Sequence, residues 1–331
     1  MNPAKCTEYD YINFVIATPS TYSCTEAARV QPPDANPPAH DSLNRLLYRL
    51  PPNSEALWTE ATPYVKKDQG ILVIDDSTLD KPYAQQMELV TRHWSGKHKQ
   101  VVSGINLITL MWTDGDTHIP CDYRLYNKQQ DNLTKNDHFQ SLIATADDRG
   151  FRPECVVFDS WYSSLKNLKT IRKYQWHWLT RLKSNRQVNL DRQGNQPVSQ
   201  LPLSNKGTIV HLKGYGLIKV FKIVSLNGNI EYWASSDLSM NDMYRLKYAE
   251  LSWSIEVYHR GIKQFVGVER CFARKAVAQR NHIGLALRAF LRLERHCFSK
   301  GISWFEAKTN IIRDAVRAYL AKPIYTLNPT A

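Results

Sequence analysis

Long hydrophobic runs are missing from this chain. No apolar stretch approaches the roughly 18 residues that a helix needs to cross a bilayer, and the N-terminus lacks the apolar core of a secretory signal peptide. The six cysteines include no CxxC pair, and the histidines have no HExxH spacing. These absences argue against a disulfide framework, a zinc ribbon and a histidine-ligated metal site. They predict reduced thiols in a cytoplasmic protein with no membrane partner.

Acidic residues are few relative to basic ones. Lys and Arg number 43 against 31 Asp and Glu, which gives a formal net charge of +12 and a pI of about 9.3. Such an excess favours a polyanionic partner, most simply nucleic acid, although a solvated basic surface would have the same composition. With 43% apolar residues, the 331-residue chain can bury a sizeable core.

Strand and helix patterns alternate along the middle of the chain, which predicts a mixed α/β fold. We expect strands at 71–75, 101–112 and 118–126 and in the run that ends at Asp159, with helices at 135–148 and 243–265. The expected organisation is a helical N-terminal region (1–60), the first part of the core (61–183), a β-rich insertion (184–240), the helical second part of the core (241–300) and a C-terminal helix and tail (301–331).

The N-terminal region has two short helical patterns, at 23–29 and at 40–47. Asp41 or Ser42 is the expected N-cap of the second. The pair is compatible either with a helix-turn-helix that binds DNA or with a small helical prefix packed on the core.

Three acids occur in settings that suit metal-assisted chemistry. Asp76 and Asp159 each follow a buried apolar run, and Glu256 lies in a helical stretch. Strand ends in an open sheet form a cleft where ligands bind, so these carboxylates can converge there. Hard oxygen ligands favour Mg²⁺ or Mn²⁺ over zinc, and a pair of such ions can drive an in-line attack on a phosphodiester. Periodicity does not choose between Asp75 and Asp76, because the run before them is apolar on both sides.

The helix that carries Glu256 also carries basic groups. His259, Arg260 and Lys263 follow at spacings that bring them to the same helical face. This stripe is typical either of a metal ligand flanked by groups that bind phosphate or of a solvated helix with charge pairs.

Three segments together resemble the catalytic signature of the DDE transposases of bacterial insertion sequences. They are Ile74-Asp75-Asp76-Ser77-Thr78, then Phe158-Asp159-Ser160-Trp161-Tyr162, then Trp253-x-x-Glu256 with Lys263 seven residues further on. The closest resemblance is to the insertion-sequence-4-like superfamily, whose RNase H-like core carries a β insertion before the glutamate. It covers roughly residues 65–295.

The resemblance implies a function and roles for individual residues. It implies an RNase H-like catalytic core that nicks and joins DNA strands in cut-and-paste transposition. In this family the acid directly before Ser or Thr is the ligand, so the resemblance selects Asp76, with Asp159 and Glu256, as the catalytic and metal-binding acids. Lys263 would contact transposon-end phosphate. The resemblance also implies two bound Mg²⁺ or Mn²⁺ ions and two double-stranded DNA partners, the transposon ends and the target. It further implies a homodimer and a nucleoid-associated location in the bacterial cytoplasm.

Further DNA contacts are expected from basic and aromatic residues outside the helical stripe. Besides Lys263, His259 and Arg260, the candidates are Lys81, Lys97, Arg274 and Trp161. Further basic residues that could contact the DNA backbone are Arg92, His98, Lys99, Arg181, Lys183, Arg270, Lys275 and Arg280. Trp161 and Trp253 flank the acids, where they could stack on a flipped base or pack the core around the site.

The chain departs from the family pattern at two positions. The family commonly has a Tyr seven residues and an Arg four residues before the glutamate, where this chain has Ala249 and Ser252. Tyr248 lies one position away from the expected Tyr. The departure leaves two alternatives open: a catalytically silent or domesticated DNA-binding protein, and a related metal-dependent nuclease that does not transfer strands.

Overall fold

The computed structural model describes residues 4–33, 37–95, 99–127 and 131–324. The chain divides into two compact units, each assembled from separated stretches of sequence. One comprises residues 1–53, 86–88 and 260–331, and the other comprises 54–85 and 89–259. The five segments expected from the sequence divide the chain differently, and their boundaries stay predictions.

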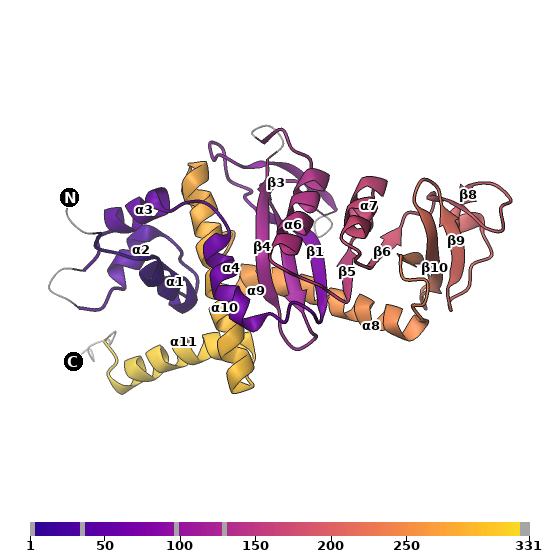
Figure 1. Ribbon diagram of the computed structural model, residues 1–331. Coiled ribbons are helices and arrows are strands. Elements are labelled where there is room, and N and C mark those ends of the chain that lie inside the picture. The colour runs from indigo at the N-terminus through magenta and orange to yellow at the C-terminus, as the bar shows by residue number, and fades with distance from the viewer. Residues whose placement is uncertain (1–3, 34–36, 96–98, 128–130, 325–331) are drawn as a thin grey trace. The chain divides into compact units, whose positions relative to one another are not determined.

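A mixed sheet forms the larger unit, which contains residues 54–85 and 89–259 (Figure 1). Its strands are β1 (Ile71–Asp80), β2 (Thr91–Ser95), β3 (Gln100–Thr113), β4 (Ile119–Tyr126), β5 (Cys155–Phe158), β6 (Trp178–Leu182), β7 (Gln187–Asn189), β8 (Gln196–Pro197), β9 (Thr208–Leu212), β10 (Gly216–Val224) and β11 (Ile230–Ser235). Among the described residues they follow the order β2-β3-β1-β5-β6-β11-β10-β9-β7-β8, with β4 paired to β3. β1, β5 and β6 are parallel neighbours, whereas the other pairings are antiparallel.

The expected β-rich insertion continues this sheet. Its strand β11 pairs with β6, with Trp233 opposite Arg181 and Ala234 opposite Thr180. Strands β10, β9, β7 and β8 then extend the same ladder. Backbone hydrogen bonds therefore join the insertion directly to the parallel strands.

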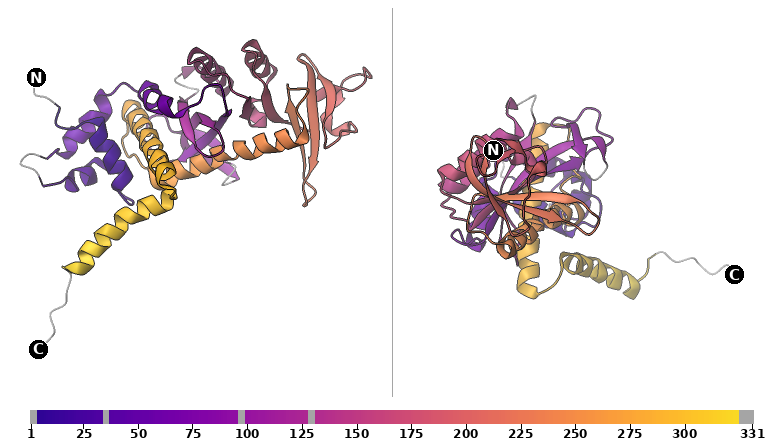
Figure 2. Two further views of the ribbon diagram at one scale, coloured as in Figure 1. Left: turned by 60° about the horizontal axis from the view of Figure 1, so that its bottom comes forward. Right: turned by 90° about the vertical axis from the view of Figure 1, so that its right-hand side faces the viewer.

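Helices cover both faces of the sheet. α6 (Lys135–Asp148) and α7 (Leu165–Lys173) lie along one face, and α8 (Asp242–Ser252) runs along the other (Figures 1 and 2). The shorter elements are α4 (Glu55–Ala61), η1 (Thr62–Tyr64), η2 (Ser160–Tyr162) and η3 (Val198–Gln200). With both faces covered, Ile71 to Ile74 of β1 are buried without exception, as is typical of strands that have parallel neighbours.

The strongest local patterns predicted their elements well. The expected helix at 135–148 is confirmed: α6 has those bounds, its N-cap Thr134 forms a capping box with Asp137, and Phe139 and Leu142 are buried. The single helix expected at 243–265 is wrong, because the chain turns at Trp253 and α9 (Ser254–Phe265) begins one residue later. Strand β2 was not expected, since its sequence is polar.

The smaller unit is helical and centres on α10 (Ala276–Lys300). Around it are α1 (Glu8–Ala17), α2 (Cys24–Arg29), α3 (His40–Arg49) and α11 (Trp304–Ala321). Arg288 forms a two-pronged ion pair with Glu8, and Asn281 donates to the carbonyls of Leu47 and Leu50 at the end of α3. Such contacts are typical of a packed helical bundle.

The expected caps of the first helices were partly right. Ser23, the first residue of the helical pattern expected at 23–29, is the N-cap of α2, and its hydroxyl accepts from the Glu26 amide. α3, by contrast, begins after Ala39, so the expected N-cap at Asp41 or Ser42 is wrong. None of the helices in the described part of the chain is both long and apolar enough to cross a membrane.

Gly267 is expected to be required for folding of the smaller unit. Its φ is +55°, and an added Cβ would overlap the ring of buried Tyr22. Gly267→Ala should therefore lower the free energy of unfolding by about 2–4 kcal/mol, from left-handed strain plus the overlap. Gly301→Ala is the matched control, because Gly301 has φ +65° with open space around it, and it should lose only about 1 kcal/mol. Equal losses in urea unfolding would contradict the role of Tyr22.

Candidate active site

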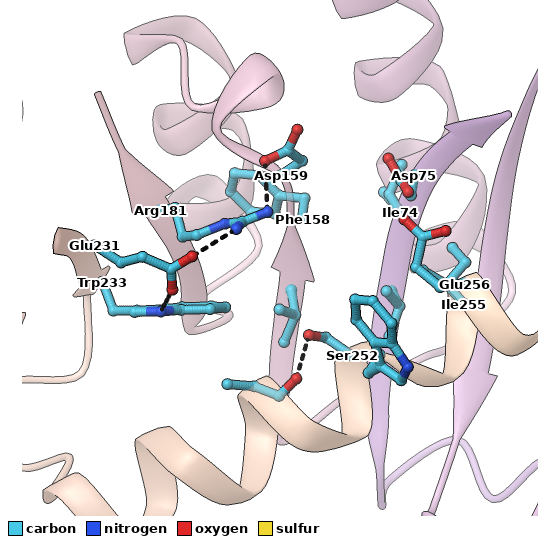
Figure 3. Close-up of a pocket in the computed structure, with 14 residues that line it drawn as sticks. Ile74, Asp75, Phe158, Asp159, Arg181, Glu231, Trp233, Ser252, Ile255 and Glu256 are labelled. Atoms are coloured by element: carbon cyan, nitrogen blue, oxygen red, sulfur yellow. Dashed lines mark hydrogen bonds and ion pairs between the residues drawn. The ribbon is translucent and has the colours of Figure 1, made fainter. Parts of the chain in front are cut away.

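A cavity of about 270 Å³ lies in the larger unit, where the parallel strands end. It receives acids from three elements: Asp75 from β1, Asp159 directly after β5, and Glu256 from the first turn of α9 (Figure 3). Arg181, Glu231 and Trp233 also line it, and α8 contributes Ala249 and Ser252. Two residues expected to be catalytic, Asp159 and Glu256, are therefore brought to one cavity.

Asp75 is the acid of β1 that lines this cavity, next to the apolar Val73 and Ile74. Burial raises its pKa well above the usual range, and the nearby carboxylates of Asp76, Glu256 and Asp159 raise it further. Nearby carboxylates make the charged form of this aspartate unfavourable. A bound cation would stabilise that charged form.

Asp76 points to the opposite face, because successive residues of a strand alternate. Its oxygens accept hydrogen bonds of 2.6 Å from Asn106 Nδ2, 2.7 Å from Lys135 Nζ and 2.7 Å from the Tyr162 hydroxyl. Burial alone would raise the pKa of Asp76, but Lys135 and these hydrogen bonds lower it below its ordinary value. The structure thus differs from the expectation taken from the resemblance. Asp75 accompanies Asp159 and Glu256, whereas Asp76 anchors Lys135 of α6.

Asp159 is held by its own loop and by Arg181. Its Oδ1 accepts a hydrogen bond of 2.5 Å from the Ser160 amide and one of 3.3 Å from Arg181 Nη2. Arg181 Nη1 in turn donates to Glu231 Oε1 at 2.9 Å, and Trp233 Nε1 donates to the other oxygen of Glu231 at 2.9 Å. Burial alone would lower the pKa of Arg181, but Glu231 and Asp159 raise it.

The donor set suits a divalent cation, although the side chains are not gathered around one point. Three hard carboxylate ligands line one cavity, and Glu256 and Asp159 add to the rise in the pKa of Asp75 that burial and Asp76 cause. In Figure 3, Asp75 and Glu256 lie side by side, whereas Asp159 is turned toward Arg181. Among the residues that the structure describes, no group of three or more His, Cys, Asp or Glu side chains is arranged to hold a metal ion.

The expected DNA-contacting residues fall into several groups. Trp161 is exposed on η2 beside Asp159, with Lys135 Nζ 5.8 Å and Lys183 Nζ 5.7 Å from its ring centroid. Trp253 is also exposed, so of the two alternatives for these tryptophans, packing in the core is wrong. Lys81 and His259 are 6% and 4% exposed, so in this conformation neither presents its side chain to a ligand.

The remaining candidates lie outside the cavity-bearing unit or outside the described residues. Arg260, Lys263 and Arg274 belong to the smaller unit. Arg260 and Arg274 are exposed, and Lys263 is half-buried. Lys97 and His98 lie outside the residues that the structure describes.

The departures on α8 have a clear structural counterpart. Ala249 and Ser252 line the cavity, and the Ser252 hydroxyl donates to the Ala249 carbonyl. Tyr248 does not replace the missing tyrosine, because it is buried and its hydroxyl donates to Glu154 at 3.1 Å. The α8 side of the cavity therefore has neither a phenol nor a guanidinium at these positions.

Sequence reasoning named Arg181 as a possible DNA contact but did not predict that Arg181, Glu231 and Lys135 lie beside the acids. Glu231 lies 50 residues beyond Arg181 in the sequence, and Lys135 lies 59 residues beyond Asp76. No local pattern links such residues, since their proximity depends on strand pairing and on the position of α6. Arg181 was recognisable only as one more basic residue.

Two family models match the chain, and each covers just over half of it. One is described as "DDE superfamily endonuclease" and matches residues 39–208, a range that contains Asp75, Asp76 and Asp159. The other, "Archaeal putative transposase ISC1217", matches residues 126–302 and includes Asp159 and Glu256. A search of curated proteins finds no match.

Solved structures of transposases are also similar. A piggyBac transposase in a synaptic complex with hairpin DNA superposes with a TM-score of 0.53 at 10% identity, over 100% of this chain and 78% of that one. This likeness identifies the RNase H-like fold. The Drosophila P element transposase in a strand transfer complex gives a TM-score of 0.20 at 11% identity, over 94% of this chain and 64% of that one, which is too low to support an argument.

Members of the DDE superfamily generally use divalent metal ions to cleave DNA by phosphoryl transfer. With both family models matching and the acids in one cavity, the chain belongs to the DDE superfamily of endonucleases and is a DNA transposase.

Proposed function

We propose that Asp75, Asp159 and Glu256 are the metal-binding acids of this transposase, and that they hold two Mg²⁺ or Mn²⁺ ions. Asp75 then has the role that the family resemblance gives to Asp76. The proposal rests on one observation: carboxylates from β1, β5 and α9 line the same cavity. Burial raises the pKa of Asp75 most, but Glu256 and Asp159 also contribute, and a shared cation would relieve that part of the repulsion.

The chemistry assigned to this site is strand nicking at the ends of an insertion sequence, followed by transfer of the freed 3′-hydroxyl to target DNA. When bound, divalent ions would activate the attacking oxygen and stabilise the leaving one. The carboxylates need only hold and orient the ions, and no Ser or Tyr of the chain forms a covalent intermediate. Arg181 supplies positive charge at the same cavity, where phosphate oxygens would lie.

The DNA contacts are proposed to come from exposed groups. Trp161 is exposed beside Asp159, and the Lys183 ammonium lies 5.7 Å from its ring centroid, which suits stacking of an unpaired base next to a bound phosphate. The exposed Arg260 and Arg274, together with the half-buried Lys263, are proposed to bind the DNA backbone. A homodimer is proposed because two transposon ends must be processed together, and a nucleoid location follows from action on chromosomal DNA.

Asp159→Ala tests this function directly. We expect metal-dependent nicking of a DNA end to fall by about 10³-fold or more, because loss of a metal ligand removes several kcal/mol of transition-state stabilisation. Binding of the same DNA in a gel-shift assay should stay within about threefold, since the backbone contacts remain. Nicking at the wild-type rate would contradict the site.

A precut DNA end supplied with target DNA distinguishes the alternatives. A transposase joins the two molecules, whereas a nuclease without strand transfer yields no joined product. A catalytically silent DNA-binding protein would bind the end tightly and neither nick nor join it with Mg²⁺ present. The last outcome would indicate that activity is lost because Ala249 and Ser252 replace the Tyr and Arg that are common in the family.

A further inference from the structure

Arg181 is the only basic residue among the described residues that line the cavity, and it shares that cavity with Asp75, Asp159, Glu231 and Glu256. The guanidinium spans two of these acids, with Nη1 on Glu231 and Nη2 on Asp159. The two contacts differ in quality. The bond to Glu231 is 2.9 Å long, whereas the bond to Asp159 is 3.3 Å long.

The position of Arg181 is set by the insertion. Trp233 lies opposite Arg181 in the β6–β11 ladder, and its indole nitrogen fixes Glu231. The guanidinium carbon of Arg181 is 5.7 Å from the centroid of the Trp233 ring. Glu231 and Trp233 therefore hold one side of the guanidinium, and the other side faces Asp159.

We propose that Arg181 is a positioning residue that exchanges partners. In the arrangement of Figure 3 it binds Asp159, and that carboxylate lies apart from Asp75 and Glu256. When a divalent cation binds, Asp159 turns to the cation, and the freed Nη2 of Arg181 takes a phosphate oxygen of the DNA while Nη1 stays on Glu231. This inference rests on the proposed role of the three acids.

The exchange is chemically balanced, because one anionic oxygen replaces another on the guanidinium. A guanidinium presents its N–H groups in a fixed fork that fits carboxylate and phosphate oxygens alike. The Asp159–Arg181 pair is 42% and 44% exposed at its two side chains, so breaking it costs little. The Asp159–Arg181 contact is therefore weak enough for Asp159 to leave Arg181 when a cation binds.

The test is a Mn²⁺ titration of the full chain without DNA, with free Mn²⁺ followed by electron paramagnetic resonance. Arg181→Gln should bind Mn²⁺ roughly two- to fivefold more tightly than wild type, because Asp159 no longer has a competing partner. Binding of a short fluorescent duplex with divalent cation present should show a log–log salt slope smaller by about one, because one phosphate contact is lost. An unchanged or weaker Mn²⁺ affinity, or an unchanged salt slope, would overturn the exchange.

Two further variants make the result specific. Arg152→Gln is the matched control, because Arg152 also pairs with an acid, Asp147, in the same unit but outside the cavity, and it should leave both measurements unchanged. Arg181→Lys keeps the positive charge, but one ammonium cannot span both acids, so its Mn²⁺ affinity should lie between those of wild type and Arg181→Gln. Wild-type affinity in Arg181→Lys would count against the two-pronged contact.

Failure of this inference is distinguishable from failure of the proposed function. Asp75→Asn should lose most Mn²⁺ binding if the three acids form the metal site. If Asp75→Asn instead binds Mn²⁺ as wild type does, the metal site itself is wrong. If only Asp75→Asn changes the titration and Arg181→Gln does not, the metal site stands and the exchange is wrong.

Discussion

Asp75→Asn should reduce metal-dependent nicking by about 10³-fold or more, whereas Asp76→Asn should stay within about tenfold of wild type per folded molecule. The physical reason is the alternation of β1, which turns Asp75 to the cavity that holds Asp159 and Glu256 and turns Asp76 away from it. Nicking rates of the two purified variants on the same labelled DNA end measure the difference.

Asp75→Asn and Asp76→Asn are a matched pair, because they make the same substitution on opposite faces of β1. Circular dichroism should establish that each preparation is folded before rates are compared. If Asp76→Asn lost nicking completely while Asp75→Asn cut at the wild-type rate, the selection made by the family resemblance would stand and our assignment would fail.

Asp76→Ala should lower the stability of the protein more than a substitution of Asp75 does. Its carboxylate pairs with Lys135 Nζ at 2.7 Å, and the two side chains are only 18% and 19% exposed. Removing it leaves an unpaired, largely buried ammonium as well as two donors, Asn106 and Tyr162, without their acceptor. We expect a loss of about 3 kcal/mol, which corresponds to a fall in Tm of about 6–12 °C.

Differential scanning calorimetry measures this loss, and two variants interpret it. Asp76→Ala combined with Lys135→Met should recover part of the stability, because no buried charge is then left without a partner. Asp75→Asn should not lower Tm, because the raised pKa of Asp75 means that its charge is unfavourable in the folded protein. A Tm of Asp76→Ala equal to that of wild type would show that the pair with Lys135 contributes nothing.

Local sequence signals predicted the elements that carry the site. The apolar runs before Asp76 and Asp159 are buried strands, and Ile255 and Ile262 of α9 are buried. The resemblance correctly indicated the superfamily and the RNase H-like fold, because its three motifs occur in order along most of the chain. These are the features that depend on near neighbours in sequence.

The choice between Asp75 and Asp76 did not follow from the sequence for a specific reason. Ile71 to Ile74 are apolar and buried on both faces of the sheet. The sequence pattern therefore does not indicate which of the two faces has the cavity. Burial of His259 and Lys81 was equally hidden, since both are polar residues whose exposure is set by distant segments. The turn at Trp253 contains no Gly or Pro that would have marked it.

The pairing of β11 with β6 means that residues 184–240 cannot be treated as a detachable module. Removing them would leave β6 as an open edge with unpaired N–H and C=O groups, next to the end of β5 where Asp159 lies. Bare edges of this kind recruit strands from other molecules and promote aggregation. A shortened relative of this protein would therefore need another segment to cover that edge.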